Sequence, residues 1–130
     1  MLLDTSALIE LQAGRHDDEV VKRIRGVIDG HPLFSSPIHL GEVADAARRI
    51  GLPVEATVRQ VRDVVDLIPL DADIAVQGSH LKAEARQRKE GKDFSLIDGI
   101  GLATARSRGM PLVTMDSQFK GFPDAIVVKR

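Results

Sequence analysis

Short apolar segments alternate with longer segments of helical periodicity along the chain, and this alternation restricts the fold more than any other feature. The first three apolar runs are each followed by apolar residues at helical spacing. Strands joined through helices run parallel in one sheet, and helices cover both of its faces. The pattern predicts an α/β fold, a three-layer α/β/α sandwich with a central, mostly parallel sheet. Expected strands are residues 1–4, 33–36, 68–70, 110–114 and 125–128, and expected helices start at residue 7 and span 18–29, 37–50, 54–65, 71–89 and 96–107.

Polar residues just before the helical segments predict where several helices begin. Thr5 or Ser6 is expected to cap the first helix, and Asp71 the helix that follows the third strand. Ser95 lies three residues before Asp98, which is the spacing of a capping box at the head of the last helix.

The length and composition are those of one compact unit. With 130 residues, of which 43% are hydrophobic, the chain suits a single domain spanning residues 1–130 around one core. No internal repeat, low-complexity stretch or linker divides it. No apolar run reaches the length of a membrane span, and the N-terminus lacks the layout of a signal peptide. We therefore expect a soluble, cytoplasmic protein with no membrane partner.

The composition also narrows the chemistry that the fold can carry. The chain has no cysteine, which excludes disulfides, thiolate zinc sites and thiol nucleophiles. It has no tyrosine or tryptophan and only four phenylalanines, so few aromatic platforms are available for stacking single-stranded bases. Because the net charge is -1, a nucleic-acid substrate would have to be held by local basic residues or bound cations.

Four carboxylates are expected to converge at one edge of the predicted sheet. Asp4 ends the first strand, and Asp116 lies just beyond the strand that ends at Thr114. Asp98 lies in the first turn of the helix that leads into that strand, and Glu42 lies in the first turns of the helix after the second strand. In open parallel sheets, sites form beyond the carboxyl ends of the strands. The sequence therefore predicts an acidic crevice there.

A divalent cation is the usual means of holding several carboxylates together, because unpaired acids repel one another and some stay protonated. Mg²⁺ and Mn²⁺ take oxygen ligands, keep several waters and bind substrate phosphate at the same time. One or two such ions lower the pKa of a bound water and neutralise the charge that develops as a phosphodiester is attacked. The pattern therefore favours metal-dependent phosphodiester chemistry.

For three of the four acids, a purely structural role is also a sufficient explanation when each residue is considered alone. Asp98 can stabilise its helix start through the capping box with Ser95, and an isolated S-x-x-D pattern favours that role. Asp116 can cap the short turn that follows it, and Glu42 can be an ordinary helix-surface acid. Asp4 is different, because an acid directly after a buried strand is costly unless it has partners.

Four segments of the chain resemble the four motif regions of PIN domains, in the same order. They are LLDTSALIE at the start, SPIHLGEVADAAR from Ser36, SLIDGIGLATARSRG from Ser95 and PLVTMDSQF from Pro111. The resemblance is greatest to the VapC toxins of type II toxin–antitoxin (VapBC) systems, and it covers nearly the whole chain. The first and last segments are the most specific of the four.

The resemblance implies a metal-dependent endoribonuclease with a PIN-like sandwich fold and an acidic pocket that binds Mg²⁺ or Mn²⁺. The catalytic acids would be Asp4, Glu42, Asp98 and Asp116, and Asp4, Asp98 and Asp116 would hold the metal. Ser6 and Thr114 match hydroxyl positions that orient these carboxylates from behind. One departure is that Ser117 and Gln118 stand where relatives often carry an arginine and an acid.

The resemblance also implies partners. Family members cut single-stranded or loop regions of RNA, often in tRNA or rRNA, with a metal-activated water. They commonly form homodimers, and a small VapB-type antitoxin neutralises them by inserting a segment near the acidic pocket. The valine-rich helix at 54–65 is a candidate dimer surface, although covering the sheet is the role that its pattern favours.

Basic residues near the predicted crevice are candidates for a rim that grips RNA phosphates. The candidate rim consists of Arg48, Arg49, Arg86, Arg88, Lys89 and Lys92. The alternative is a solvated helix face, because Glu84 and Glu90 interrupt the run. The four histidines show no ligand spacing and are expected to be surface or structural residues rather than metal ligands.

Rival functions differ in how well the sequence fits them. A phosphatase of the haloacid-dehalogenase type needs a second aspartate two residues after the first, and the chain has Asp4-Thr5-Ser6 instead. A receiver domain needs an acidic pair near the first strand, which is also absent. A non-catalytic RNA- or protein-binding module and a PIN nuclease of RNA processing outside a toxin–antitoxin pair share the same residues, so both stay open.

Overall fold

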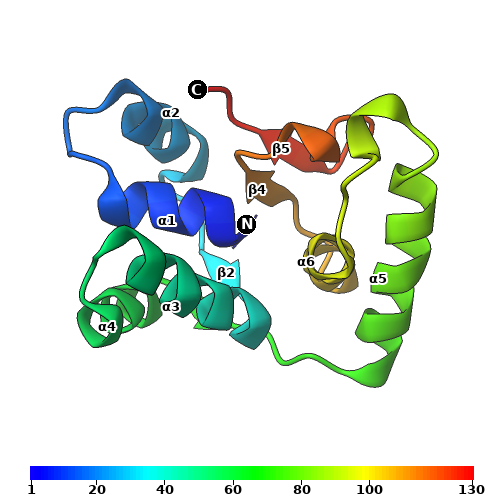
Figure 1. Ribbon diagram of the computed structural model, residues 1–130, viewed down its shortest axis with the longest axis horizontal. Helices are drawn as coiled ribbons and strands as arrows, with labels where there is room; N and C mark the ends of the chain where they lie inside the picture. Colours follow the sequence, from blue (N-terminus) through cyan, green and yellow to red (C-terminus); the bar gives the residue numbers. More distant parts are fainter.

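The computed structural model describes all 130 residues as five strands and six α-helices, with two 3₁₀ turns (Figure 1). The strands are β1 (Leu2–Leu3), β2 (Phe34–Ser35), β3 (Asp66–Leu67), β4 (Leu112–Thr114) and β5 (Ala125–Val127). The helices are α1 (Thr5–Ala13), α2 (Glu19–Ile28), α3 (Pro37–Ile50), α4 (Val54–Val64), α5 (Ala72–Ala85) and α6 (Leu96–Ser107). The 3₁₀ turns are η1 (Lys89–Gly91) and η2 (Ser117–Phe119). None of the helices has the length and apolar character needed to cross a membrane.

All five strands run parallel in one sheet, in the order β3-β2-β1-β4-β5. The central strand, β1, pairs with β2 on one side and with β4 on the other. The chain moves from β1 outward to β2 and β3, and then crosses over to β4 and β5. A parallel sheet in which the strand order reverses in this way has its crevice at the carboxyl ends of the strands beside the reversal. In this molecule that place is the end of β1.

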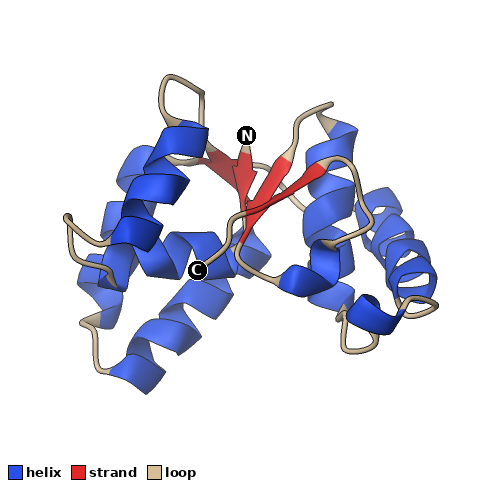
Figure 2. Ribbon diagram, turned by 90° about the horizontal axis from the view of Figure 1, so that it is seen from above, coloured by secondary structure: helices blue, strands red, loops and turns tan.

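The sheet separates two hydrophobic cores, because successive residues of a strand face opposite sides. Leu2 and Leu112 belong to the core that α5 and α6 cover. Leu3 and Val113 belong to the core that α1, α2, α3 and α4 cover. Figure 2 shows the strands lying between these two groups of helices. The predicted three-layer α/β/α sandwich is confirmed, and the sheet is entirely parallel.

The helix predicted at 54–65 packs against α3 and α1, with Val61 fully buried in the core. Val65 is also buried, whereas Val64 leaves 55% of its surface exposed. Val61 and Val65 therefore cover the core, as the sequence pattern favours, whereas Val54 and Val58 are only half-buried.

The third strand lies earlier than the sequence predicts. The expected strand at residues 68–70 is wrong, and β3 is formed by Asp66 and Leu67, which pair with Phe34 and Ser35. The ladder ends with the Ile68 N–H, which donates to the Ser35 carbonyl at 2.9 Å. Pro69 follows and has no N–H, so the ladder cannot continue through the Ile-Pro-Leu segment.

Two helix boundaries also differ from the predictions. The first helix is capped by Asp4 rather than by Thr5 or Ser6, because Asp4 Oδ1 accepts the Ala7 N–H at 3.1 Å. The fifth helix ends at Ala85 rather than near residue 89. There the chain folds back so tightly that a β-carbon at Gly91 would collide with the Ala85 carbonyl oxygen. The predicted caps at Asp71 and Ser95, by contrast, are confirmed.

Two glycines allow α5 to lie directly against α6. A β-carbon at Gly99 would collide with the Gly78 carbonyl oxygen, and one at Gly78 would lie 2.8 Å from the Ile100 nitrogen. Figure 1 shows α6 between α5 and the sheet. Because Gly99 follows Asp98 directly, this close packing also fixes the position of an acid that the sequence predicts to be functional.

We expect Gly99→Ala to lower the free energy of unfolding by about 1–3 kcal/mol, because the added methyl group cannot be accommodated without moving α5. Gly26→Ala is the matched control, since Gly26 lies within α2 with nothing within 4 Å of its missing β-carbon. That substitution is expected to raise stability by about 0.5–1 kcal/mol, because alanine is the better helix former. Urea unfolding measures both, and a Gly99→Ala protein as stable as Gly26→Ala would contradict this packing.

Candidate active site

A pocket of about 270 Å³ opens at the carboxyl end of the central strands and is lined by all four predicted acids. Asp4 follows β1 directly, and Asp116 lies two residues beyond the end of β4. Glu42 comes from α3, and Asp98 from the first turn of α6. The structure therefore brings together carboxylates from four separate segments, at the crevice that the strand order predicts.

Asp4 is the most buried of these acids, with 6% of its surface exposed. Its Oδ1 accepts hydrogen bonds from the Ser6 hydroxyl at 2.7 Å and from the Ala7 N–H at 3.1 Å. Burial, with a smaller contribution from the nearby Asp98, raises the pKa of Asp4 to about 6 against the opposing hydrogen bonding by Thr114, Ser6 and Ala7. Asp4 is thus a carboxyl group held in place but poorly solvated in its charged form.

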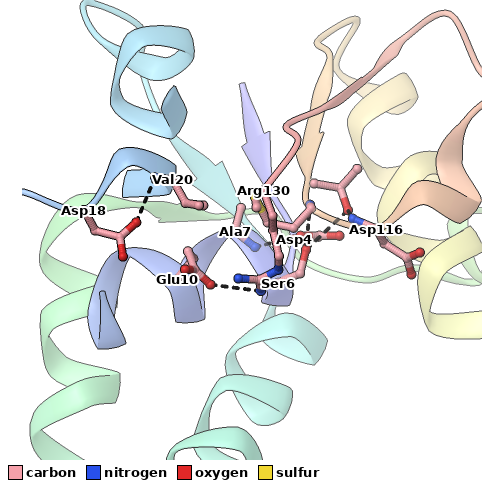
Figure 3. A network of polar contacts seen from close by, with 10 residues as sticks. Asp4, Ser6, Ala7, Glu10, Asp18, Val20, Asp116 and Arg130 are labelled. Atoms are coloured by element: carbon pink, nitrogen blue, oxygen red, sulfur yellow. Dashed lines mark hydrogen bonds and ion pairs between the residues drawn. The ribbon is translucent and has the colours of Figure 1, made fainter. Parts of the chain in front are cut away.

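The hydroxyls of Ser6 and Thr114 connect Asp4 to the segment that carries Asp116. Besides donating to Asp4, Ser6 Oγ accepts the Met115 N–H at 2.9 Å and lies 3.3 Å from Thr114 Oγ1. Thr114 Oγ1 in turn accepts the Asp116 N–H at 3.0 Å. Figure 3 shows this network, with Arg130 from the end of the chain paired to Glu10 of α1 beside it. The two hydroxyls therefore lie behind the carboxylates, in the positions that the resemblance implies.

Asp98 both caps its helix and lines the pocket. Its Oδ2 accepts the Ser95 N–H at 2.8 Å, and its own N–H donates to Ser95 Oγ at 3.0 Å, which completes the predicted capping box. Burial raises the pKa of Asp98, and Asp116 and Glu42 add to the rise, against the hydrogen bonds from Ser95. The structural and functional interpretations of this residue are therefore compatible.

Glu42 and Asp116 are each fixed by one hydrogen bond. Thr5 Oγ1 donates to Glu42 Oε1 at 2.6 Å, which joins the start of α1 to α3. The Gln118 N–H donates to Asp116 Oδ1 at 2.9 Å, so Asp116 caps η2 while it lines the pocket. The contact between Thr5 and Glu42 has no counterpart in the sequence predictions, because nothing in the local pattern links residues 37 positions apart.

The donor set of the pocket suits a hard divalent cation. On Glu42, Asp98 and Asp116, the hydrogen bonds of the protein engage one carboxylate oxygen and leave the other without a donor. No three acidic or histidine side chains are close enough to enclose a metal ion by themselves. Mg²⁺ does not need such a cage, because it keeps several waters and binds through one or two carboxylates together with substrate phosphate. The pocket therefore fits Mg²⁺ or Mn²⁺ better than a metal that requires a closed protein cage.

Among the candidate rim residues, only Arg49 lines the acidic pocket. It lies seven residues after Glu42, about 10 Å further along the same face of α3. Arg48 is exposed and lies 3.6 Å from Asp45. At the pocket itself, Arg49 is therefore the one candidate for a rim residue that contacts phosphate.

The rest of the candidate rim lies after α5, and two of its members have structural partners. Arg86 Nε donates to the Phe94 carbonyl at 2.9 Å. Arg88 pairs with Glu84 at 3.2 Å and stacks over the Phe122 ring, 4.6 Å from its centroid. These two guanidinium groups therefore help to hold the chain together, and their expected role as phosphate contacts stays a prediction. Lys89 and Lys92 are exposed, with no ion pair.

His39 is a pocket residue that the sequence analysis did not select. It lies in the first turn of α3, is 2% exposed, and its Nδ1 lies 2.7 Å from Ser36 Oγ. Burial lowers the pKa of His39 to about 4, so the imidazole is neutral at pH 7. The available signal was its position three residues after the helix cap Ser36, which places both side chains on the same turn.

Residues 1–124 match the PIN domain family, and the chain belongs to that family. It is 27% identical over 128 residues to ribonuclease VapC5 of Mycobacterium tuberculosis, an alignment that covers 98% of this chain and 91% of the relative.

Solved structures agree with this assignment. A chain of a toxin–antitoxin complex from Klebsiella pneumoniae superimposes with a TM-score of 0.75 and 26% identity, covering 99% of this chain and 98% of the other. VapC20 of Mycobacterium tuberculosis, described as a toxin that cleaves the sarcin–ricin loop, gives 0.69 at 21% identity, covering 95% and 97%. A chain of VapBC2 from Rickettsia felis, bound to a promoter DNA fragment, gives 0.66 at 17% identity, covering 97% and 95%. The last two similarities show the shared fold.

Asp4→Asn is expected to stabilise the protein at pH 7 in EDTA by about 2 kcal/mol, because the amide removes a buried charge and its oxygen can still accept from Ser6 and Ala7. The folded-state pKa of about 6 lies above the ordinary aspartate value of 3.8, so the folded state binds the proton more tightly. The stability that this proton supplies is complete below about pH 4 and is lost as the pH rises through 6.

The measurement is urea unfolding of both proteins between pH 4 and pH 7. The gain from Asp4→Asn should shrink toward zero at the acidic end. Asp71→Asn is the control, because Asp71 also caps a helix but is exposed. A gain from Asp4→Asn that is independent of pH would show that the charge of Asp4 is not the cause.

Proposed function

We propose that this protein is a metal-dependent endoribonuclease that hydrolyses RNA phosphodiesters at the acidic pocket. The observation that carries the proposal is the convergence of Asp4, Glu42, Asp98 and Asp116 on one pocket, where three of them keep a carboxylate oxygen without a protein donor. Membership of the PIN domain family and the similarity to ribonuclease VapC5 support the choice of RNA as the substrate.

In this proposal Asp4, Asp98 and Asp116 would hold Mg²⁺ or Mn²⁺, in part through the waters that the ion keeps, and Glu42 completes the acidic set. When bound, the ion would supply a water of lowered pKa and neutralise charge on the phosphate. The contribution of the chain is to keep the carboxylates in place before the ion and the substrate arrive. Ser6 and Thr114 do this for Asp4 and the Asp116 segment, and Thr5 does it for Glu42.

Arg49 contributes the positive charge that the pocket otherwise lacks. It is the only cationic side chain lining the pocket, at the end away from the helix start that carries Glu42. We assign it to a phosphate that flanks the one being cleaved, because two helical turns separate it from Glu42. The neighbouring Ile9 and Ala46 provide an uncharged wall for the RNA between these two phosphates.

The biological role that we propose is that of a VapC-type toxin. The chain and the Klebsiella pneumoniae toxin–antitoxin component match over nearly their full lengths, as do the chain and VapC5. By this proposal a small VapB-type antitoxin neutralises the protein near the acidic pocket, and the toxin forms a homodimer. Its substrate would be a structured RNA such as tRNA or rRNA, and the catalytic unit would be the single domain formed by residues 1–130.

We expect the wild-type protein to cut a labelled tRNA or rRNA pool in Mg²⁺ or Mn²⁺ and not in excess EDTA. Asp98→Asn should lower the cleavage rate about 100-fold or more, because the amide keeps the capping box but removes a metal-binding oxygen. Asp63→Asn, an exposed change on α4, is the matched control and should cut normally.

Expression in cells provides a second measurement of the same variants. The wild type should arrest growth, Asp98→Asn should not, and co-expression of the cognate antitoxin should relieve the arrest. Equal cutting by wild type and Asp98→Asn would contradict the assignment of cleavage to the acidic pocket, because the activity would then come from a contaminant. Binding without cutting would favour the RNA-binding module, and cutting without growth arrest would favour a nuclease of RNA processing.

Arg49→Ala is expected to weaken RNA binding about 3- to 10-fold at low salt and to reduce the salt dependence of binding by about one ion. Arg48→Ala changes the neighbouring arginine, which pairs with Asp45, and should have little effect. Filter binding to the Asp98→Asn protein across a salt series measures both without cleavage. If the two variants weaken binding equally, Arg49 has no specific phosphate contact.

A further inference from the structure

His39 occupies the junction between the two helices that carry Glu42 and Asp98. It lies one turn before Glu42 on α3, and its ring reaches α6 at Gly101. A β-carbon at Gly101 would lie 2.8 Å from His39 Nε2 and 2.9 Å from Cε1, so only glycine leaves room for the ring. The imidazole is therefore held at the wall of the acidic pocket, which it lines.

The hydrogen bonds around Ser36 determine which nitrogen of the ring carries the proton. Ser36 Oγ accepts the His39 backbone N–H at 3.2 Å and lies 2.7 Å from Nδ1. Ser36 is 1% exposed, and the only acceptor for its hydroxyl proton is Nδ1. Leaving that proton without an acceptor would carry the cost of a buried unsatisfied donor. Nδ1 is therefore the acceptor, and in a neutral ring the proton is on Nε2.

This Nε2–H is a hydrogen-bond donor that the protein itself does not use. Nε2 makes no hydrogen bond within the protein, and it is not among the fully enclosed atoms that lack a partner. Because the residue is 2% exposed and lines the pocket, the small open part of the ring faces the pocket. The nearly buried Nε2–H of His39 is thus directed into a pocket that is otherwise lined mainly by carboxylates.

Few other donors are free in this pocket. The Thr5 hydroxyl donates to Glu42, and the Ser6 hydroxyl donates to Asp4, so neither proton is available to a ligand. Arg49 is the remaining lining residue with N–H groups, at the far end of the α3 face. His39 is therefore the donor nearest to the four acids along α3. A neutral donor in this position adds no charge that would compete with a cation for the carboxylates.

We propose that His39 donates its Nε2–H to a non-bridging oxygen of the phosphodiester that is cleaved in the acidic pocket. The inference rests on the proposed nuclease function and adds a substrate-binding residue to it. A phosphate oxygen is the acceptor of choice, because it carries negative charge, whereas a water bound to a cation presents its protons outward and is a poor acceptor. His39 thus contacts the substrate directly and orients the phosphate against the carboxylates.

The test compares substrates that differ in the proposed acceptor. Wild type, His39→Leu and His39→Gln are assayed on an RNA with an ordinary phosphate at the cleaved bond, and on each of its two phosphorothioate diastereomers. His39→Leu should lower kcat/KM on the ordinary RNA about 10- to 100-fold, as expected for a hydrogen bond to a charged group. On one diastereomer the loss should be much smaller, because sulfur is a weak acceptor. His39→Gln, whose amide can donate from a similar position, should recover most of the activity.

Controls separate this contact from a purely structural role. His80→Leu makes the same change at an exposed position of α5 and should leave cleavage unchanged. Urea unfolding shows whether His39→Leu is folded. If it is not, His39→Gln is compared with the wild type on the three substrates instead. An equal loss on all three substrates, or no loss on any, would overturn the phosphate contact.

A second measurement does not depend on cleavage. The ¹⁵N spectrum of the His39 ring at pH 7 should show a neutral imidazole protonated at Nε2. That resonance should shift when an RNA oligonucleotide is added with Ca²⁺, and the His80 ring should not respond. A proton on Nδ1, or a doubly protonated ring, would overturn the proposal even if the protein cuts RNA. A shifted Nε2–H in a protein that cuts no RNA would instead overturn the nuclease function and leave the contact standing.

Discussion

The burial of Asp4 at the junction of β1 and α1 is the constraint around which the site is built. A carboxylate at the end of a central strand is poorly solvated, and three polar groups, from Ser6, Ala7 and Thr114, offset part of that cost. The same residue caps α1, so the strand, the helix and the acid are fixed by one side chain. A cation at the pocket would remove the remaining penalty, which couples the stability of the fold to the chemistry that we propose.

The second side of the pocket depends on how closely α6 can approach its neighbours. Gly99 lets α5 lie against it, and Gly101 leaves room for the ring of His39. Just before these two glycines, the capping box of Ser95 and Asp98 starts the helix at the pocket. Helix capping and site formation are therefore one arrangement, which is why the structural interpretation of Asp98 is compatible with the functional one that we propose.

The pocket is lined mainly by carboxylates and has very few free hydrogen-bond donors. Its acids are fixed through hydroxyls and backbone N–H groups, and its cationic wall is limited to Arg49. Of the basic residues that are clustered in sequence after α5, Arg86 and Arg88 bind the chain around Phe94 and Phe122. In our proposal, phosphate recognition therefore depends on Arg49 and His39 more than on a broad basic rim.

The sequence by itself determined the layer order, most helix boundaries, the capping box at Ser95 and the four acids, because these follow from local periodicity and from the ends of strands. It misplaced β3 and the cap of α1, where one residue in the ladder or one side-chain bond decides the boundary. Only the tertiary structure decided which donors face the pocket. Contacts such as Thr5 with Glu42, or His39 with Gly101, join residues far apart in the chain, and no local pattern encodes them.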